Sequence, residues 1–213
     1  MSINGSFTLH RLIGLLLGSC IVTSSHADFD VLAMLGDDSE SASVNSGPET
    51  NPIGNSKQYG QAGSVEWTIG GMVCAEFGIT ELAVIRNEVD WFVRDRFSIG
   101  LQLDVGGAWV GGDGYTGTLG VATIARWHFL HRETWTLFAD VGIGLAWFGA
   151  PLPEEGTRLN FSPQAGLGAT FKLDDRLRLH VSAGWYHLSN ARTSSSNPGF
   201  DGLAVQVGIG IGF

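Results

Sequence analysis

Hydrophobic residues alternate with polar or small residues from about residue 64 to the end of the chain. In segment 97–109, the odd positions carry Phe97, Ile99, Leu101, Leu103, Val105, Gly107 and Trp109, and the even positions carry Ser98, Gly100, Gln102, Asp104, Gly106 and Ala108. Successive side chains of a β-strand point to opposite faces, so the pattern predicts a strand with one hydrophobic face and one small or polar face. Eight such strands are predicted, at about 64–74, 79–93, 96–109, 117–129, 135–148, 158–173, 176–190 and 200–213.

The connections between the predicted strands differ in length at the two ends. The tight, charged turns are 93–96, 130–134 and 174–175. The connections at the other end are 75–78, which is short, and the longer segments 110–116, 149–157 and 191–199. Short turns at one end and longer loops at the other, in an even-numbered antiparallel series, are typical of an outer-membrane β-barrel.

A soluble β-sandwich or lipocalin-like barrel would also show alternation, with its hydrophobic face turned inward. The predicted strands of about 11–16 residues favour the membrane barrel, because they can cross a bilayer at a tilt whereas strands of globular proteins average about 5–6 residues. The polar face is rich in glycine, which suits the narrow lumen of an eight-stranded barrel. Its charges have mixed signs and are predicted to pair there: Glu66, Arg86, Glu88, Asp90, Asp104, Arg126, Asp140, Lys172 and Arg178.

Aromatic residues near the strand ends agree with the membrane barrel. The tryptophans are Trp67, Trp91, Trp109, Trp127, Trp135, Trp147 and Trp185, and they are expected to form girdles at the membrane interfaces. The last strand alternates up to a terminal Phe213, which resembles the signal by which outer-membrane barrels are recognised for assembly. The sequence therefore predicts an all-β fold, an eight-stranded antiparallel transmembrane β-barrel of the bacterial outer membrane.

The amino-acid composition and the absence of certain motifs disfavour several classes of function. Charged residues make up 15% of the 213 residues, well below the roughly 25% of average soluble proteins. Twelve Lys and Arg against 21 Asp and Glu give a net charge of −9, which disfavours nucleic-acid binding. The sequence has no zinc-type spacing of Cys and His, no Walker loop and no dinucleotide fingerprint, so neither a metal nor a cofactor is predicted.

The first 61 residues are predicted to be a leader and a linker. Residues 1–27 read as a secretory signal peptide, with a short basic flank, an apolar stretch and small residues before a cleavage site after Ala27. The alternative is a lipoprotein signal with Cys20 acylated in the sequence Leu17-Gly18-Ser19-Cys20. Cleavage after Ala27 removes Cys20 and leaves Cys74 without an intrachain disulfide partner. Residues 28–61 are predicted to be an acidic, flexible periplasmic linker, followed by the barrel over 62–213.

Three polar residues depart from the hydrophobic face of the last two predicted strands. The outward positions of the seventh strand continue to His187 and Ser189, and those of the eighth strand, counted back from Phe213, reach Asp201. Polar groups that face acyl chains are costly unless paired, so they tend to be functional. With both barrel termini in the periplasm, the three residues are expected at the outer end, beside lipopolysaccharide.

These residue types can perform nucleophilic catalysis. A histidine that takes the proton of Ser189 would make its hydroxyl a nucleophile, and the Asp201 carboxylate would fix the tautomer of His187. Side chains at positions i and i+2 of a strand lie close enough for Ser189 and His187 to meet. The alternative is a non-catalytic polar cluster at the membrane interface, where such residues cost little.

The sequence Trp185-Tyr186-His187-Leu188-Ser189-Asn190-Ala191, followed by Asn197-Pro198-Gly199-Phe200-Asp201, resembles the His-x-Ser-Asn signature of the outer-membrane lipid A 3-O-deacylases, the PagL-type acyloxyacyl hydrolases. The resemblance implies an eight-stranded barrel that hydrolyses the ester-linked 3-hydroxyacyl chain at the 3-position of lipid A, without a cofactor. It implies lipid A or lipopolysaccharide as substrate and the outer membrane as location, and it leaves a homodimer open.

Carried over by position, the resemblance makes Ser189 the nucleophile, His187 the base and Asp201 the orienting acid. Asn190 and Asn197 match asparagines around the family's site, and one of them is expected to supply an oxyanion donor. Asn190 has inward parity, so its alternative role is to end the strand. The family commonly has Glu where this sequence has Asp201, one methylene shorter, which puts the reach of the acid in question.

Two other functions remain open on the sequence. One is a non-catalytic small barrel, structural or adhesin-like, in which the longer loops are the working part. The other is a lipid A acyltransferase of similar architecture, which is disfavoured because no acyl-measuring interior is evident in the sequence.

Overall fold

The computed structural model describes residues 58–76, 80–110, 114–152 and 155–213. The predicted signal peptide and the predicted linker up to residue 57 lie outside the described residues. The described strands are β1 (Val65–Glu76), β2 (Thr80–Arg94), β3 (Phe97–Val110), β4 (Gly114–His131), β5 (Trp135–Leu152), β6 (Thr157–Phe161), β7 (Gln164–Lys172), β8 (Leu177–Leu188) and β9 (Phe200–Gly212).

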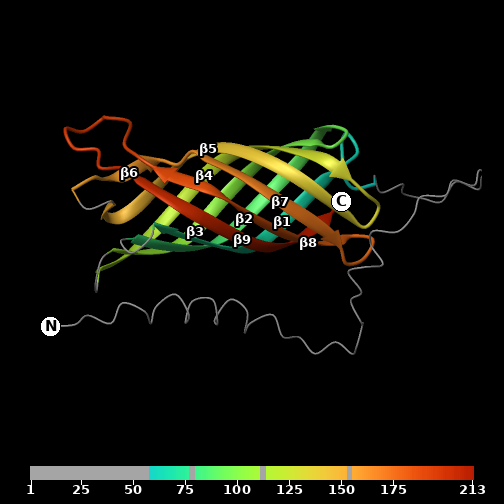
Figure 1. Ribbon diagram of the computed structural model, residues 1–213, viewed down its shortest axis with the longest axis horizontal. Coiled ribbons are helices and arrows are strands. Elements are labelled where there is room, and N and C mark those ends of the chain that lie inside the picture. The colour runs from blue at the N-terminus through green and yellow to red at the C-terminus, as the bar shows by residue number, and fades with distance from the viewer. Residues whose placement is uncertain (1–57, 77–79, 111–113, 153–154) are drawn as a thin grey trace, which may run out of the picture. The chain divides into compact units, whose positions relative to one another are not determined.

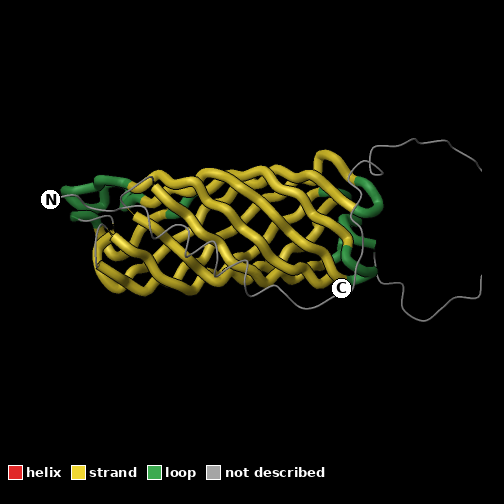
Figure 2. The backbone as a smooth tube through the Cα atoms, turned by 60° about the horizontal axis from the view of Figure 1, so that its bottom comes forward, coloured by secondary structure: helices red, strands yellow, loops and turns green. Residues whose placement is uncertain are grey.

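The strands form one closed antiparallel barrel (Figures 1 and 2). The order runs from β4 through β3, β2, β1, β9, β8 and β7 to β5, and β4 pairs with β5 to close the sheet. β6 and β7 both pair with β5 and together occupy one position in the barrel. The predicted eight-stranded barrel is therefore confirmed, with its sixth predicted strand divided in two.

The division between β6 and β7 falls at Ser162 and Pro163. Proline has no N–H to donate to a sheet ladder, so the regular pairing stops there. The chain still stays beside β8, because the His187 N–H donates to the Pro163 carbonyl over 3.0 Å. This irregular point lies next to the predicted site residues.

The outer wall of the barrel is hydrophobic. Odd-numbered aliphatic side chains point outward, and Val141, Ile143 and Leu167 are each more than 60% exposed. The exposed tryptophans of the wall are Trp67, Trp91, Trp109, Trp127, Trp147 and Trp185. Exposure of such a wall to water would be unfavourable, whereas contact with the acyl chains of a bilayer is favourable. Within the described ranges, no α-helix is long and apolar enough to cross a membrane.

We call the end of the barrel that contains Phe213 the terminal end, and the end that carries the β8–β9 connection the loop end (Figure 1). The lumen toward the terminal end is polar. Arg126 lies 2.6 Å from Glu88, 2.9 Å from Asp90 and 3.3 Å from Asp140, so three carboxylates surround one guanidinium group. These contacts confirm the predicted pairing of lumen charges.

Other pairs extend the polar lumen. Arg86 donates to both carboxylate oxygens of Asp104, and His180 lies 3.1 Å from Glu66. The glycines of the inward face leave room for these side chains. A Cβ atom at Gly168, for example, would collide with the ring of Phe138.

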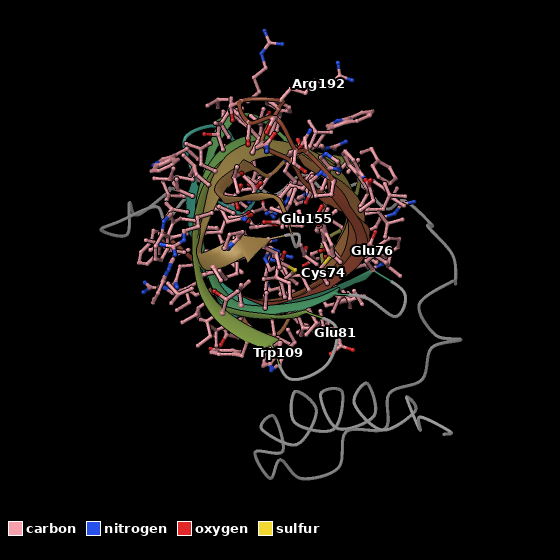
Figure 3. The ribbon with its side chains drawn as sticks, turned by 90° about the vertical axis from the view of Figure 1, so that its left-hand side faces the viewer. Cys74, Glu76, Glu81, Trp109, Glu155 and Arg192 are labelled. Carbon is pink, nitrogen blue, oxygen red and sulfur yellow. The ribbon has the colours of Figure 1, made fainter. Side chains whose placement is uncertain are left out.

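The lumen toward the loop end is apolar, which the alternation did not predict. We name this cluster the apolar plug; its buried members are Met72, Cys74, Leu82, Val84, Ala108, Ala146, Phe148, Leu152, Tyr186, Leu188 and Phe200. Both faces of the strands are hydrophobic here, one toward lipid and one toward the plug. Figure 3 looks along the barrel from this end and shows Cys74 inside the ring of strands.

Two of the predicted longer loops are largely strand. Val110 pairs with Gly114, so β3 and β4 continue into the segment expected as the loop 110–116. β5 runs to Leu152, which pairs with Thr157 across a β-bulge, into the expected loop 149–157. Backbone hydrogen bonding continues beyond the predicted strand ends in both hairpins. The connection 189–199 is long, as predicted.

Candidate active site

The pairing of β8 with β9 places His187 directly opposite Asp201. The His187 Nδ1 atom lies 2.9 Å from Asp201 Oδ1, a hydrogen-bond distance. The side chains are 23% and 62% exposed, so the pair lies on the outside of the barrel and not in the lumen. The predicted outward register of both residues is therefore what the structure shows.

The residues next to His187 and Asp201 in the sequence hold this pair in place from the inside of the barrel. Tyr186 and Leu188 on β8 and Phe200 on β9 point inward and are at most 4% exposed in the apolar plug. His187 is thus bracketed by two side chains packed in the core, and Asp201 directly follows a third. Close packing of this kind restricts backbone movement, so the site is held on a rigid part of the barrel.

The backbone of Ser189 is fixed by the neighbouring strand segment. Ser189 and Phe161 form an isolated antiparallel bridge with hydrogen bonds of 2.7 and 3.1 Å. Its side chain is half-buried, two residues beyond His187. Among the described residues, no hydrogen bond joins the Ser189 hydroxyl to the His187 ring. The structure therefore brings His187 and Asp201 into contact and leaves the contact between Ser189 and His187 unformed.

Asn190 is buried and organises the β8–β9 loop. It is 2% exposed, in agreement with its inward parity. Its Nδ2 donates to the Ser196 carbonyl, and its Oδ1 accepts from the Arg192 N–H, at 2.7 and 2.9 Å. The Thr193 N–H donates to the Asn190 carbonyl at 2.9 Å, while Ala191 and Arg192 have φ angles of 50° and 63°. The segment thus makes a tight turn around the Asn190 side chain.

Of the two asparagines, Asn197 is the more available as a hydrogen-bond donor. It is exposed, and its Oδ1 accepts the backbone N–H of Asn190 over 3.0 Å. Within the described part of the chain, its Nδ2 group has no hydrogen-bond partner. Asn197 therefore presents a free donor from a fixed side chain, whereas the side chain of Asn190 is engaged in the loop.

The hydrogen bond to Asp201 sets the tautomer of His187. An ionised carboxylate only accepts hydrogen bonds, so the proton of a neutral His187 ring lies on Nδ1. Nε2 is then left as an acceptor. A ring in this state can take a proton from a hydroxyl group. The shorter side chain of Asp201 reaches the imidazole, which answers the question raised by the absence of Glu at this position.

Trp185 is a site residue that the sequence placed only in the interfacial girdle. Its indole Nε1 donates to Asp201 Oδ1 over 2.7 Å, and its ring stacks on His187 with centroids 5.5 Å apart. Its position, two residues before His187 in the same outward register, placed it on the same face as the site, and no further signal for this contact is present in the sequence.

The histidines on the inward face take part in other contacts. His128 Nδ1 lies 2.8 Å from the Thr136 hydroxyl, and His180 lies beside Glu66. Both lie in the lumen, His128 in a hydrogen bond with Thr136 and His180 in contact with the Glu66 carboxylate. Among the described residues, no group of three or more His, Cys, Asp or Glu side chains is arranged to hold a metal ion.

One of the comparisons with known proteins matches a protein family over most of the barrel. The family model described as lipid A 3-O-deacylase (PagL) matches residues 75–210, which include His187, Ser189 and Asp201. No curated protein sequence matches the chain. The homodimer left open by the sequence finds no support in these comparisons.

Solved structures of small outer-membrane barrels resemble this fold. Neisserial surface protein A has 9% identity and a TM-score of 0.53, covering 70% of this chain and 96% of its own. The outer membrane enzyme PagL has 20% identity and a TM-score of 0.45, with 68% and 97% covered. OprG from Pseudomonas aeruginosa has 9% identity and a TM-score of 0.48, with 72% and 97% covered. The similarity to the neisserial protein concerns the fold alone.

Proposed function

The chain belongs to the lipid A 3-O-deacylase (PagL) family of the outer membrane, and we propose that it hydrolyses the ester-linked 3-hydroxyacyl chain at the 3-position of lipid A. The observation that carries the proposal is the hydrogen bond between His187 and Asp201 on the lipid-facing wall. Polar side chains on the lipid-facing side of a membrane protein are rare and tend to be functional, which supports a role for this pair in a reaction on a membrane molecule.

The proposed reaction begins with Ser189 as nucleophile. Its Oγ attacks the ester carbonyl carbon while Nε2 of His187 takes the hydroxyl proton, and the Asp201 carboxylate stabilises the resulting imidazolium. The contact between Ser189 and His187 forms by rotation of the Ser189 side chain, because its backbone is held by Phe161. Catalytic hydrogen bonds commonly tighten only when substrate is bound.

The negative charge on the tetrahedral intermediate needs a donor, and Asn197 supplies it from its Nδ2 group in this proposal. Collapse of the intermediate breaks the ester bond, and His187 returns the proton to the departing 3-oxygen of the sugar. Water then attacks the acyl-enzyme with His187 as base. The products are a free 3-hydroxy fatty acid and lipid A with a 3-hydroxyl group.

The surroundings of the site suit a substrate that lies in the same bilayer. Phe161 is 39% exposed and Leu203 is 51% exposed beside the site, so acyl chains meet hydrophobic side chains there. With the barrel termini in the periplasm, the loop end lies in the outer leaflet. A lipid A molecule can then reach Ser189 by lateral diffusion, with its acyl chains remaining in hydrocarbon.

Two arginines near Ser189 support an anionic substrate. Arg192 follows Ser189 by three residues, and Arg158 precedes Phe161, the bridge partner of Ser189, by three residues; both are exposed. Figure 3 shows Arg192 at the rim of the barrel. Guanidinium groups bind phosphate well, and lipid A carries phosphate groups on its sugars.

The test is expression of the wild-type protein and of Ser189→Ala in a bacterium whose lipid A retains its 3-O-acyl chain. Mass spectrometry of lipid A is expected to show loss of one 3-hydroxyacyl chain with the wild-type protein and no loss with the variant. Equal amounts of both folded proteins in the outer membrane provide the control. An unchanged lipid A profile with folded wild-type protein would instead support a non-catalytic barrel.

A further inference from the structure

Trp185 contacts both members of the pair that the proposed reaction needs. The indole N–H donates to Asp201 Oδ1 over 2.7 Å, and the same oxygen lies 2.9 Å from His187 Nδ1. The indole and imidazole rings stack with an interplanar angle of 22°. One side chain thus restrains the carboxylate through a hydrogen bond and the imidazole through ring contact.

We propose that Trp185 is a positioning residue of this active site, an inference that rests on the proposed function. Its N–H holds Oδ1 of Asp201 at the place where His187 donates, and its ring restrains the imidazole plane, so that Nε2 stays available for the proposed reaction with Ser189. The role is exerted through Asp201 and His187, and Trp185 itself touches no reacting atom.

The exposure of Asp201 explains why a second anchor is needed. Its side chain is 62% exposed and stands at the beginning of β9, next to Gly202 and two residues after Gly199. An exposed carboxylate exchanges its partners with water and samples several rotamers. The Trp185 donor removes part of this freedom, because the Trp185 backbone is held in the regular ladder, where it pairs with Leu203.

The other tryptophans of the wall show that this contact differs from an interfacial anchor. Trp147 is 49% exposed on β5 and Trp185 is 46% exposed on β8, so both have the exposure expected of a girdle residue. Among the described residues, Trp185 is the only tryptophan whose indole N–H donates to another side chain. A girdle role therefore accounts for its exposure and leaves its contact with Asp201 unexplained.

The experiment compares Trp185→Phe with the control Trp147→Phe in purified, folded protein acting on lipid A in detergent micelles. Phenylalanine keeps an aromatic ring at the membrane surface and removes the N–H donor. The kcat of Trp185→Phe is expected to fall about 5- to 15-fold with KM unchanged. This is less than the full effect of one hydrogen bond to a charged group, because the Asp201 side chain is 62% exposed and water replaces part of the contact. Trp147→Phe is expected to stay within about twofold of the wild-type protein, because surface changes of this kind cost little.

A double-mutant cycle separates positioning from general stability. If Trp185 acts through the carboxylate, then Trp185→Phe has little further effect in an Asp201→Ala background. Equal fold losses in both backgrounds would overturn the proposal, as would a Trp185→Phe enzyme as active as Trp147→Phe. The heat-dependent electrophoretic mobility of each variant reports whether the barrel has folded. An inactive wild-type protein would refute the proposed function itself, which is a different outcome from a failed cycle.

Discussion

Replacement of Asp201 by asparagine tests the strength of the acid in this site. Asparagine keeps the size and one acceptor oxygen, but it removes the charge that stabilises the His187 imidazolium. A hydrogen bond to a charged group contributes about 1.5–3 kcal/mol, and each 1.36 kcal/mol changes a rate tenfold. The kcat of Asp201→Asn is therefore expected to fall about 10- to 150-fold.

The solvent exposure of Asp201 is the reason why we expect a moderate loss of kcat. In a buried triad, loss of the acid lowers kcat by about 10⁴-fold, because no water can replace the carboxylate. Here the Asp201 side chain is 62% exposed, so water screens its charge and substitutes for part of its contribution. The expected loss of kcat is therefore smaller than the loss in a buried triad.

The assay is release of 3-hydroxy fatty acid from lipid A, quantified by mass spectrometry, with kcat and KM determined separately. Glu81→Gln is the matched control, because it removes a carboxylate at the same end of the barrel on β2. It is expected to retain wild-type kcat. A kcat of Asp201→Asn within twofold of wild type, or as low as that of Ser189→Ala, would refute this account of the acid.

Three further predictions concern the lumen and the β8–β9 loop. Arg126→Met leaves three carboxylates without their guanidinium partner and is expected to lower the free energy of unfolding by about 3–5 kcal/mol, measured by denaturant titration of tryptophan fluorescence in micelles. The exposed Arg94→Met is its control, and equal stabilities of the two variants would contradict the importance of the buried cluster. Asn197→Asp keeps the acceptor for the Asn190 N–H, removes the amide donor, and is expected to lower kcat about 100-fold. Asn190→Ala is expected to release the loop, with faster tryptic cleavage after Arg192, and unchanged cleavage would argue against its anchoring role.

The alternation of residues was sufficient to predict the barrel and the outward position of the site. A strand has a period of two, so the hydrophobic positions of β8 and β9 fixed the side on which His187 and Asp201 emerge. Their contact required one further fact, the register of the two strands, which the structure gives by pairing His187 with Asp201. The break at Pro163 between β6 and β7 was not predicted, because the alternation runs on through 158–173 as one strand.

Other features could not be read from that period. Near the loop end both strand faces are hydrophobic, as at Phe148 and Leu188, so alternation weakens and the apolar plug was not predicted. The separate roles of Asn190 and Asn197 depend on a turn with two non-glycine residues at positive φ, and residue type gives little indication of it. The contact between Trp185 and Asp201 depends on side-chain rotamers, which a pattern of burial does not specify.

The central claim is that Ser189 is a nucleophile activated by His187 on the outer wall of the barrel. The most direct measurement is covalent labelling of the folded protein with an alkyl fluorophosphonate, followed by peptide mass spectrometry. We expect a single adduct on Ser189, its formation greatly slowed in His187→Asn and slowed to a lesser degree in Asp201→Asn. Labelling at another serine, or labelling of Ser189 that proceeds equally fast without His187, would contradict the claim.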